Sequence, residues 1–237
     1  MRQLFIFITI LFLSIECIAQ EKEFLTIDWE QIKKEAMDNP QQVKDLVARF
    51  SAKDTDTTLT LQEMRLAFYG QSFLTNDKED EYMFDLYDQL RKKQLKECLI
   101  TVKIILDINP LNLDALTTLS NIFSAAANAT NDSGRTAAAL AKSAQERAQR
   151  IFQLIAATGD GSKDHPFYVT KVSDEYCFMR HYLDLWEYRG QYMKDKQDVI
   201  MLKKKSENYK ESTICFEITR VFELDMMKVM RKGKKSK

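Results

Sequence analysis

The residues best suited to chemistry lie in one short loop beyond the middle of the chain. Asp160, Asp164 and His165 are close together there, and Glu175 follows. A histidine titrates near neutral pH, and a carboxylate beside it can orient it as a general acid or base. One hypothesis is therefore a hydrolase that uses the Asp160–His165 loop together with Glu175.

The same loop has a structural interpretation, which we favour. Gly159 is suited to end a helix in the left-handed conformation, Asp160-Gly161 is typical of a turn, and Pro166 is suited to begin a strand. The sequence contains no Gly-x-Ser-x-Gly, no Gly-rich phosphate loop and no dinucleotide-binding fingerprint. We therefore predict no catalytic residue, no cofactor and no enzymatic activity.

Metal-binding patterns are also missing from the sequence. His165 and His181 are the only histidines, and they lie sixteen positions apart, whereas zinc sites use His or Cys at short fixed spacing. Asp54-Thr55-Asp56 resembles the start of a calcium loop, but Leu59 stands where such a loop needs glycine. We predict no metal site.

Aromatic and arginine side chains are the candidate binding residues, because such residues anchor many interfaces. Stacked helix pairs form grooves without any catalytic group. We predict that such a groove takes a protein or peptide partner through Tyr69, Tyr82, Tyr87 and Arg91.

A second aromatic group lies near the C-terminus, at Trp186, Tyr188, Tyr192 and Tyr209. It is either a surface for a glycan or peptide, or the core and rim of a small sheet. We favour the core interpretation, because aromatic residues dominate cores as well as interfaces.

The first residues are typical of a secretory signal peptide. Arg2 supplies a positive start, Leu4–Leu13 is apolar, and Cys17-Ile18-Ala19 offers small residues for cleavage. The apolar run is shorter than the roughly 20 residues that span a bilayer. We predict that residues 1–19 are removed, that no transmembrane segment remains, and that the protein is exported to the periplasm or cell envelope of a Gram-negative bacterium. Lipidation at Cys17 is the alternative.

The composition favours a mostly helical protein with a sizeable core. The chain is 45% hydrophobic and contains only six Gly and three Pro, fewer turn residues than many-stranded folds usually need. Its formal net charge of zero gives no general argument for nucleic acid or an anionic membrane. After cleavage Cys98, Cys177 and Cys215 remain. Cys177 and Cys215 could pair, but we favour buried free thiols.

Caps and apolar periodicity predict helices over residues 20–161. Capping boxes are expected at Asp28 with Gln31 and at Thr60 with Glu63. Asn39-Pro40 should end one helix and begin the next, and Ser133 should cap a long helix.

The stretch from about Asp80 to Thr130 resembles a tetratricopeptide junction. Its apolar residues predict three helices, with Cys98 as the small residue of one helix and a break at residues 107–112. The match covers about one and a half repeats. We therefore predict tetratricopeptide-like packing for the helical array.

The pattern changes after Gly161, where residues 162–227 predict a small α+β region. Strands are expected at Phe167–Val172, Val199–Leu202 and Ile214–Phe222, with a short helix capped by Ser173. The strands should form a small antiparallel sheet against the helices, which makes the fold class α+β. Residues 228–237 predict a basic, disordered tail.

Several motifs together resemble an uncharacterised domain-of-unknown-function family of exported Bacteroidetes-type bacterial proteins. They are Thr158–Lys163, Phe167-Tyr168-Val169, Val172–Tyr176, Leu59–Glu63 and Tyr69-Gly70. The resemblance implies helical repeats, a C-terminal sheet and export, and it implies no activity.

These observations predict an exported, non-enzymatic binding or scaffold protein of the bacterial envelope. Its partner would be a protein or peptide and not a nucleic acid. A periplasmic hydrolase that uses the Asp160–His165 loop is the alternative, and a permanent structural subunit of an envelope complex is a third possibility.

Overall fold

The computed structural model describes residues 23–52, 56–127 and 132–235. The predicted signal peptide lies outside the described residues. The N-terminal part is helical, and its helices are α1 (Trp29–Asp38), α2 (Pro40–Phe50), α3 (Leu61–Thr75), α4 (Asp80–Arg91), α5 (Leu95–Ile108), α6 (Leu113–Ala126) and α7 (Asp132–Ala157).

Short polar side chains start several of these helices where the sequence predicts. The capping box of Thr60 and Glu63 is complete at α3, and the Asn39 side chain accepts a hydrogen bond from Gln42 at the start of α2. Asp28 caps α1, but Gln31 donates to Glu35, so only half of that predicted box forms.

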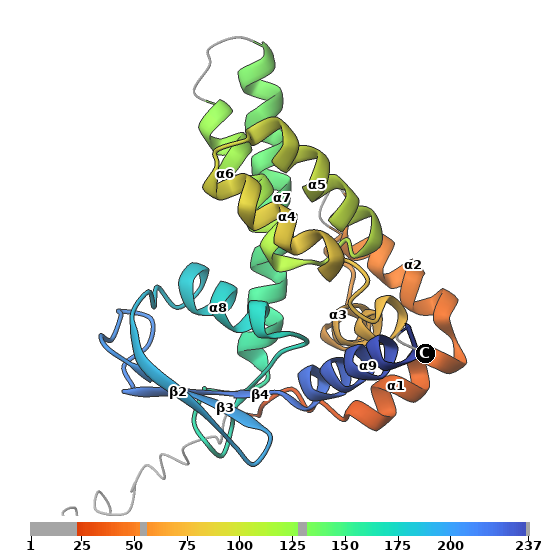
Figure 1. The fold of residues 1–237 in the computed structure, drawn as a ribbon, viewed down its shortest axis with the longest axis vertical. Coiled ribbons are helices and arrows are strands. Elements are labelled where there is room, and N and C mark those ends of the chain that lie inside the picture. Colours follow the sequence, from red (N-terminus) through yellow and green to blue (C-terminus); the bar gives the residue numbers. More distant parts are fainter. Residues whose placement is uncertain (1–22, 53–55, 128–131, 236–237) are drawn as a thin grey trace, which may run out of the picture.

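Helices α4 to α7 form an arm that rises from the rest of the molecule (Figure 1). Helix α4 packs on α5, α5 on α6, and α6 on α7, as tetratricopeptide-like packing requires. Met83, Leu86 and Val102 form a second apolar cluster there with Cys98. Cys98, Cys177 and Cys215 are buried and free, which confirms the favoured prediction for the thiols.

The C-terminal part contains β1 (Phe167–Tyr168), α8 (Val172–His181), β2 (Tyr188–Lys194), β3 (Gln197–Leu202), β4 (Thr213–Glu217) and α9 (Thr219–Lys235). The strand order is β1-β4-β3-β2. Strands β2, β3 and β4 pair antiparallel, whereas β1 pairs parallel with β4, so the sheet is mixed. The predicted α+β class is confirmed.

Several predicted boundaries are wrong because segments that were expected to be strand or disordered tail are helical. The strand expected at Phe167–Val172 has two residues, because α8 begins at Val172 and includes Ser173. The strand expected at Ile214–Phe222 ends at Glu217, and the tail expected to be disordered belongs to α9 as far as Lys235.

Two further details of the loops and caps differ from the sequence prediction. Helix α7 already includes Ser133, since it begins at Asp132. The left-handed glycine is Gly161, with φ of 78°, and not Gly159. A Cβ on Gly159 would lie 2.3 Å from the carbonyl oxygen of His165, so Gly159 is needed for close backbone approach.

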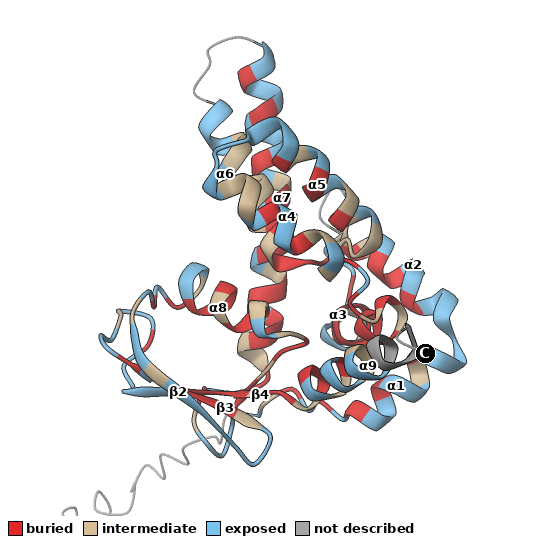
Figure 2. Ribbon diagram, in the orientation of Figure 1, coloured by how far each residue is buried: buried red, intermediate tan, exposed pale blue. Residues whose placement is uncertain are grey.

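One hydrophobic core extends across residue 161. Phe152 of α7 packs on Phe178 of α8, and Tyr69 of α3 donates a hydrogen bond to the carbonyl of Tyr168 in β1. Buried residues concentrate where α7, α8 and the sheet meet the lower helices (Figure 2). No described helix is long and apolar enough to cross a membrane.

Candidate functional site

A cluster of buried charges joins the α3–α4 connection to the start of α8 and to α9. The ammonium Nζ of Lys171 lies 2.6 Å from Glu79, 3.4 Å from Asp80 and 3.6 Å from Asp77. Lys228 of α9 adds a second ammonium, 2.7 Å from Asp80 and 3.1 Å from Asp77. Two lysines therefore face three carboxylates.

The carboxylates of this cluster keep Lys171 charged. Burial by itself lowers the pKa of Lys171, but Glu79, Asp77 and Asp80 outweigh burial, and the pKa lies above its ordinary value. Burial raises the pKa of Asp77, and Lys171 opposes that effect.

Asp77, Glu79 and Asp80 also have the spacing of a metal-ligand set, since their oxygens lie within 4.8 Å of one another. The ammonium of Lys171 already stands against all three carboxylates, where a metal ion would stand. A divalent cation there would be repelled by both lysines. We therefore assign the cluster to structure, as a clamp between elements that are distant in sequence.

The four predicted binding residues lie in different surroundings. Tyr69 is fully buried in the core. Tyr82, Tyr87 and Arg91 share α4, where Tyr82 packs against the second apolar cluster. Tyr87 lines a cavity of about 310 Å³ beside the charge cluster, and Arg91 is exposed and paired with Asp88. Tyr69 therefore has a packing role, and only Tyr87 of the four lines this cavity.

The C-terminal aromatics are mostly on the surface, contrary to the interpretation favoured from sequence. Trp186, Tyr188 and Tyr192 are 62%, 45% and 49% exposed, and only Tyr209 is buried. Tyr188 and Tyr192 lie on β2, and Trp186 lies just before it. We call Trp186, Tyr188, Tyr192 and Met193 the β2 surface.

Strand β2 is an edge of the sheet. It pairs with β3, and no other described strand pairs with its outer side. The register shifts between Tyr188 and Gly190. Tyr188 and Met193 therefore lie on the face that packs against α8, and Tyr192 lies on the opposite face. The outer edge thus combines free backbone groups with apolar side chains on both faces.

A buried pair of carboxyl groups lies behind this strand. Glu175 of α8 is fully buried beside Asp198 of β3, which accepts a hydrogen bond from Gln191 of β2 at 3.3 Å. Burial first, and Asp198 second, raise the pKa of Glu175 to about 9. Glu175 therefore keeps its proton near neutral pH.

The loop of the hydrolase hypothesis is arranged as a turn. Asp160 accepts a hydrogen bond from the backbone N–H of Ser162, and His165 is exposed with its ring against Phe24. Among the described residues no ion pair joins His165 to a carboxylate. Glu175 is buried among Asp198 and Asp174 instead.

One family model matches most of the chain, over residues 30–227: the domain of unknown function named DUF4919. The chain belongs to the DUF4919 family. This confirms the resemblance to an uncharacterised family. No curated protein and no solved structure matches the chain.

The sequence prediction for this DUF4919 chain missed β2 because its turn lacks the usual signal. Residues Asp195 and Lys196 connect β2 to β3 with φ of 53° and 63°, the conformation of a two-residue hairpin turn. Such turns usually have glycine as their second residue, and this one has Lys196 there. The aromatic residues Tyr188 and Tyr192 were the available signal, because aromatic residues are enriched in strands.

Proposed function

We propose that this DUF4919 protein is an exported, non-enzymatic binding protein of the envelope of a Gram-negative bacterium, and that it holds a protein or peptide partner along the edge of β2. The observation that supports this proposal is the exposed edge strand with its aromatic side chains. Export is inferred from the predicted signal peptide.

An extended segment can add to such an edge as a further strand. Main-chain hydrogen bonds then supply affinity, and side chains on alternate faces supply specificity. A strand added beside β2 would meet Tyr188 and Met193 on one face and Tyr192 on the other. Strand β2 carries two features that often protect an exposed edge, namely cations at Arg189 and Lys194 and a register shift between Tyr188 and Gly190. The partner strand is therefore expected to pair beyond the shift, along residues 191–194.

The positions of the carboxyl groups argue against catalysis and therefore favour binding. The carboxylates of the charge cluster face Lys171 and Lys228, and Glu175 is buried without access to solvent. A general acid or base must reach the proton that it transfers.

Two substitutions at Met193 distinguish binding through the backbone of β2 from binding through the Met193 side chain. In a two-residue hairpin the residues flanking the turn, Lys194 and Gln197, exchange hydrogen bonds, so the N–H of Met193 points outward. Met193→Pro removes that N–H, and Met193→Ala keeps it.

The experiment is retention of envelope polypeptides by the tagged chain from Gln20 onward. We expect one polypeptide to bind the unchanged chain, to be retained by Met193→Ala and to be lost with Met193→Pro. Tyr188→Ala with Tyr192→Ala should weaken retention. The proposal is wrong if no polypeptide is retained, or if a folded Met193→Pro chain retains it fully.

A further inference from the structure

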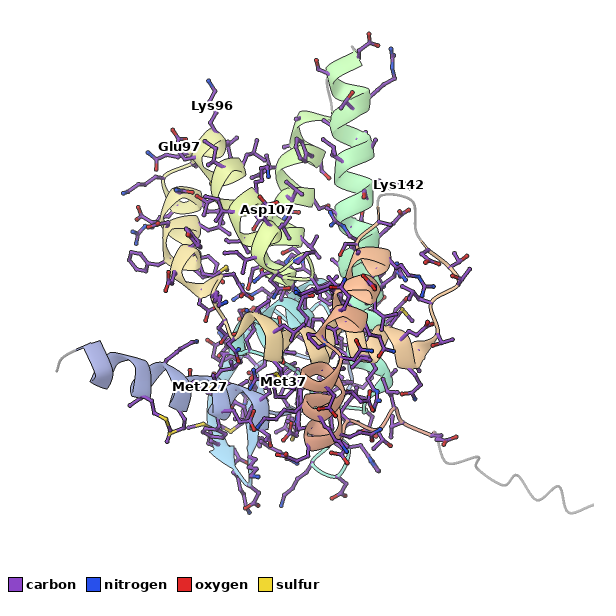
Figure 3. All side chains as sticks on the ribbon, turned by 90° about the vertical axis from the view of Figure 1, so that its right-hand side faces the viewer. Met37, Lys96, Glu97, Asp107, Lys142 and Met227 are labelled. Carbon is purple, nitrogen blue, oxygen red and sulfur yellow. The ribbon has the colours of Figure 1, made fainter. Side chains whose placement is uncertain are left out.

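Helix α9 has an exposed apolar stripe. Phe222, Met226 and Met230 are spaced four residues apart and are 40%, 57% and 59% exposed, and Val229 lies on the same face. Figure 3 shows α9 extending away from the body, with Met227 on it and Met37 on the neighbouring α1. We call Phe222, Met226, Val229 and Met230 the α9 stripe.

The stripe adjoins a groove of about 700 Å³ between α9 and α1. Its lining combines charged side chains such as Glu30, Lys33 and Glu223 with apolar ones, which are Met37, Phe73, Phe222, Met226, Met227 and Met230. Methionine is flexible and polarizable, and it suits surfaces that adapt to varied apolar partners.

Other side chains of α9 hold the helix to the protein. Arg220 is 2% exposed, lies over the ring of Phe73 at 3.9 Å, and donates to the carbonyl of Ser72 at 2.6 Å. Leu224 is buried in the same direction, and Lys228 pairs with Asp80. These contacts hold α9 to the body and leave Met226, Val229 and Met230 more than half exposed.

The end of the same helix is strongly basic. After Asp225 the chain contains no acidic side chain, and beyond Lys228, which pairs with Asp80, α9 contains Arg231, Lys232, Lys234 and Lys235. A zero net charge over the whole chain conceals this local excess. Anionic lipid headgroups attract such clusters of Lys and Arg.

We propose that α9 is a peripheral membrane-binding helix that lays its stripe on an anionic phospholipid surface. An apolar face combined with many cations is the pattern of helices that lie in the plane of the membrane interface. The contact is with the membrane surface, because the apolar face covers only one side of α9.

The observations favour a bilayer over a protein as the occupant. Phe222, Met226 and Met230 line the groove from α9, which projects from the body (Figure 3), and each is at least 40% exposed. A protein partner would need both a complementary apolar surface and an acidic patch, whereas an anionic bilayer presents both over any area.

The test is sedimentation with vesicles of phosphatidylethanolamine and phosphatidylglycerol, compared with phosphatidylcholine vesicles. The chain from Gln20 onward is used, because the apolar leader would bind vesicles by itself. We expect binding to the anionic vesicles only, weakened by salt. Met226→Asp with Met230→Asp should lower the apparent affinity about tenfold or more, because it removes apolar burial and adds repulsion.

Phe84→Asp with Ile100→Asp is the matched control, since Phe84 and Ile100 are exposed apolar residues on α4 and α5. It should bind like the unchanged chain, as should Met193→Pro, which tests the partner proposal separately. The membrane proposal is overturned if the unchanged chain does not sediment with anionic vesicles. It is also overturned if the control substitutions at Phe84 and Ile100 lower binding as much as the substitutions at Met226 and Met230. A dimer in solution that dissociates in the stripe variant would also overturn it.

Discussion

The ammonium of Lys171 lies 2.6 Å from Oε1 of Glu79, a residue with no exposure to solvent. The two residues are 92 positions apart and join the start of α8 to the start of α4. A buried carboxylate without its cation is costly. This contact therefore holds the sheet region against the helical arm.

Lys171→Met should lower the free energy of unfolding by about 3–5 kcal/mol, because it leaves Glu79 and Asp77 buried without that cation. Urea denaturation measures this change. The matched control is Lys103→Met, whose ion pair with Asp107 is exposed, and it should stay within about 1 kcal/mol. Equal effects of the two substitutions would contradict the clamp.

Stability should depend on pH through Glu175. Its pKa is about 9 in the folded protein, against an ordinary value of 4.5, so the folded state holds the proton that the unfolded state releases between these values. The free energy of unfolding should therefore fall as pH rises through this window and level off above it.

Glu175→Gln should remove this dependence. Asp174, whose pKa burial raises to about 7, contributes in the same direction at lower pH, so the clearest comparison lies between about pH 7 and pH 9. There the variant should be the more stable, by a few kcal/mol, in denaturation at each pH. Parallel curves for the two proteins would show that Glu175 is not the titrating group.

Tyr69→Phe should act on stability and not on binding. The Tyr69 hydroxyl donates to the carbonyl of Tyr168 at 3.0 Å, and the substitution removes this donor from a part-buried acceptor. We expect a loss of about 1–2 kcal/mol in thermal or urea unfolding. Tyr192→Phe, at an exposed ring, should change stability by less than about 0.5 kcal/mol. Weaker partner retention by Tyr69→Phe would restore its predicted binding role.

Gly159→Ala should destabilise the protein by at least about 2 kcal/mol, because its Cβ would lie 2.3 Å from one backbone oxygen and 2.4 Å from another. Gly190→Ala is the control. Its Cβ would lie 3.2 Å from the methyl end of Met201, which can move aside, so unfolding should change by less than about 1 kcal/mol. A neutral Gly159→Ala would show that the loop can shift.

Local signals predicted much of the helical part correctly. The Thr60–Glu63 capping box acts within one turn, so four residues of sequence contain its cause. The apolar spacing of α4 and α5 likewise states which face must be buried.

The strand predictions failed where two local preferences compete. Ile214–Phe222 alternates as a strand should, yet the chain turns into a helix at Thr219. Arg220 finds Ser72, Asn76 and Phe73 only when the segment is helical and docked. Those contacts are with residues more than a hundred positions away, and periodicity does not record them.

The amino-acid sequence by itself determined the α+β class, the main helices and the burial of three free thiols, because caps, apolar spacing and side-chain hydrophobicity act locally. The tertiary structure decided that Lys171 meets Glu79, that Glu175 meets Asp198, and which aromatic residues face solvent. Such pairs depend on how distant segments pack, and the burial that shifts the pKa of a carboxyl group exists only after that packing has formed.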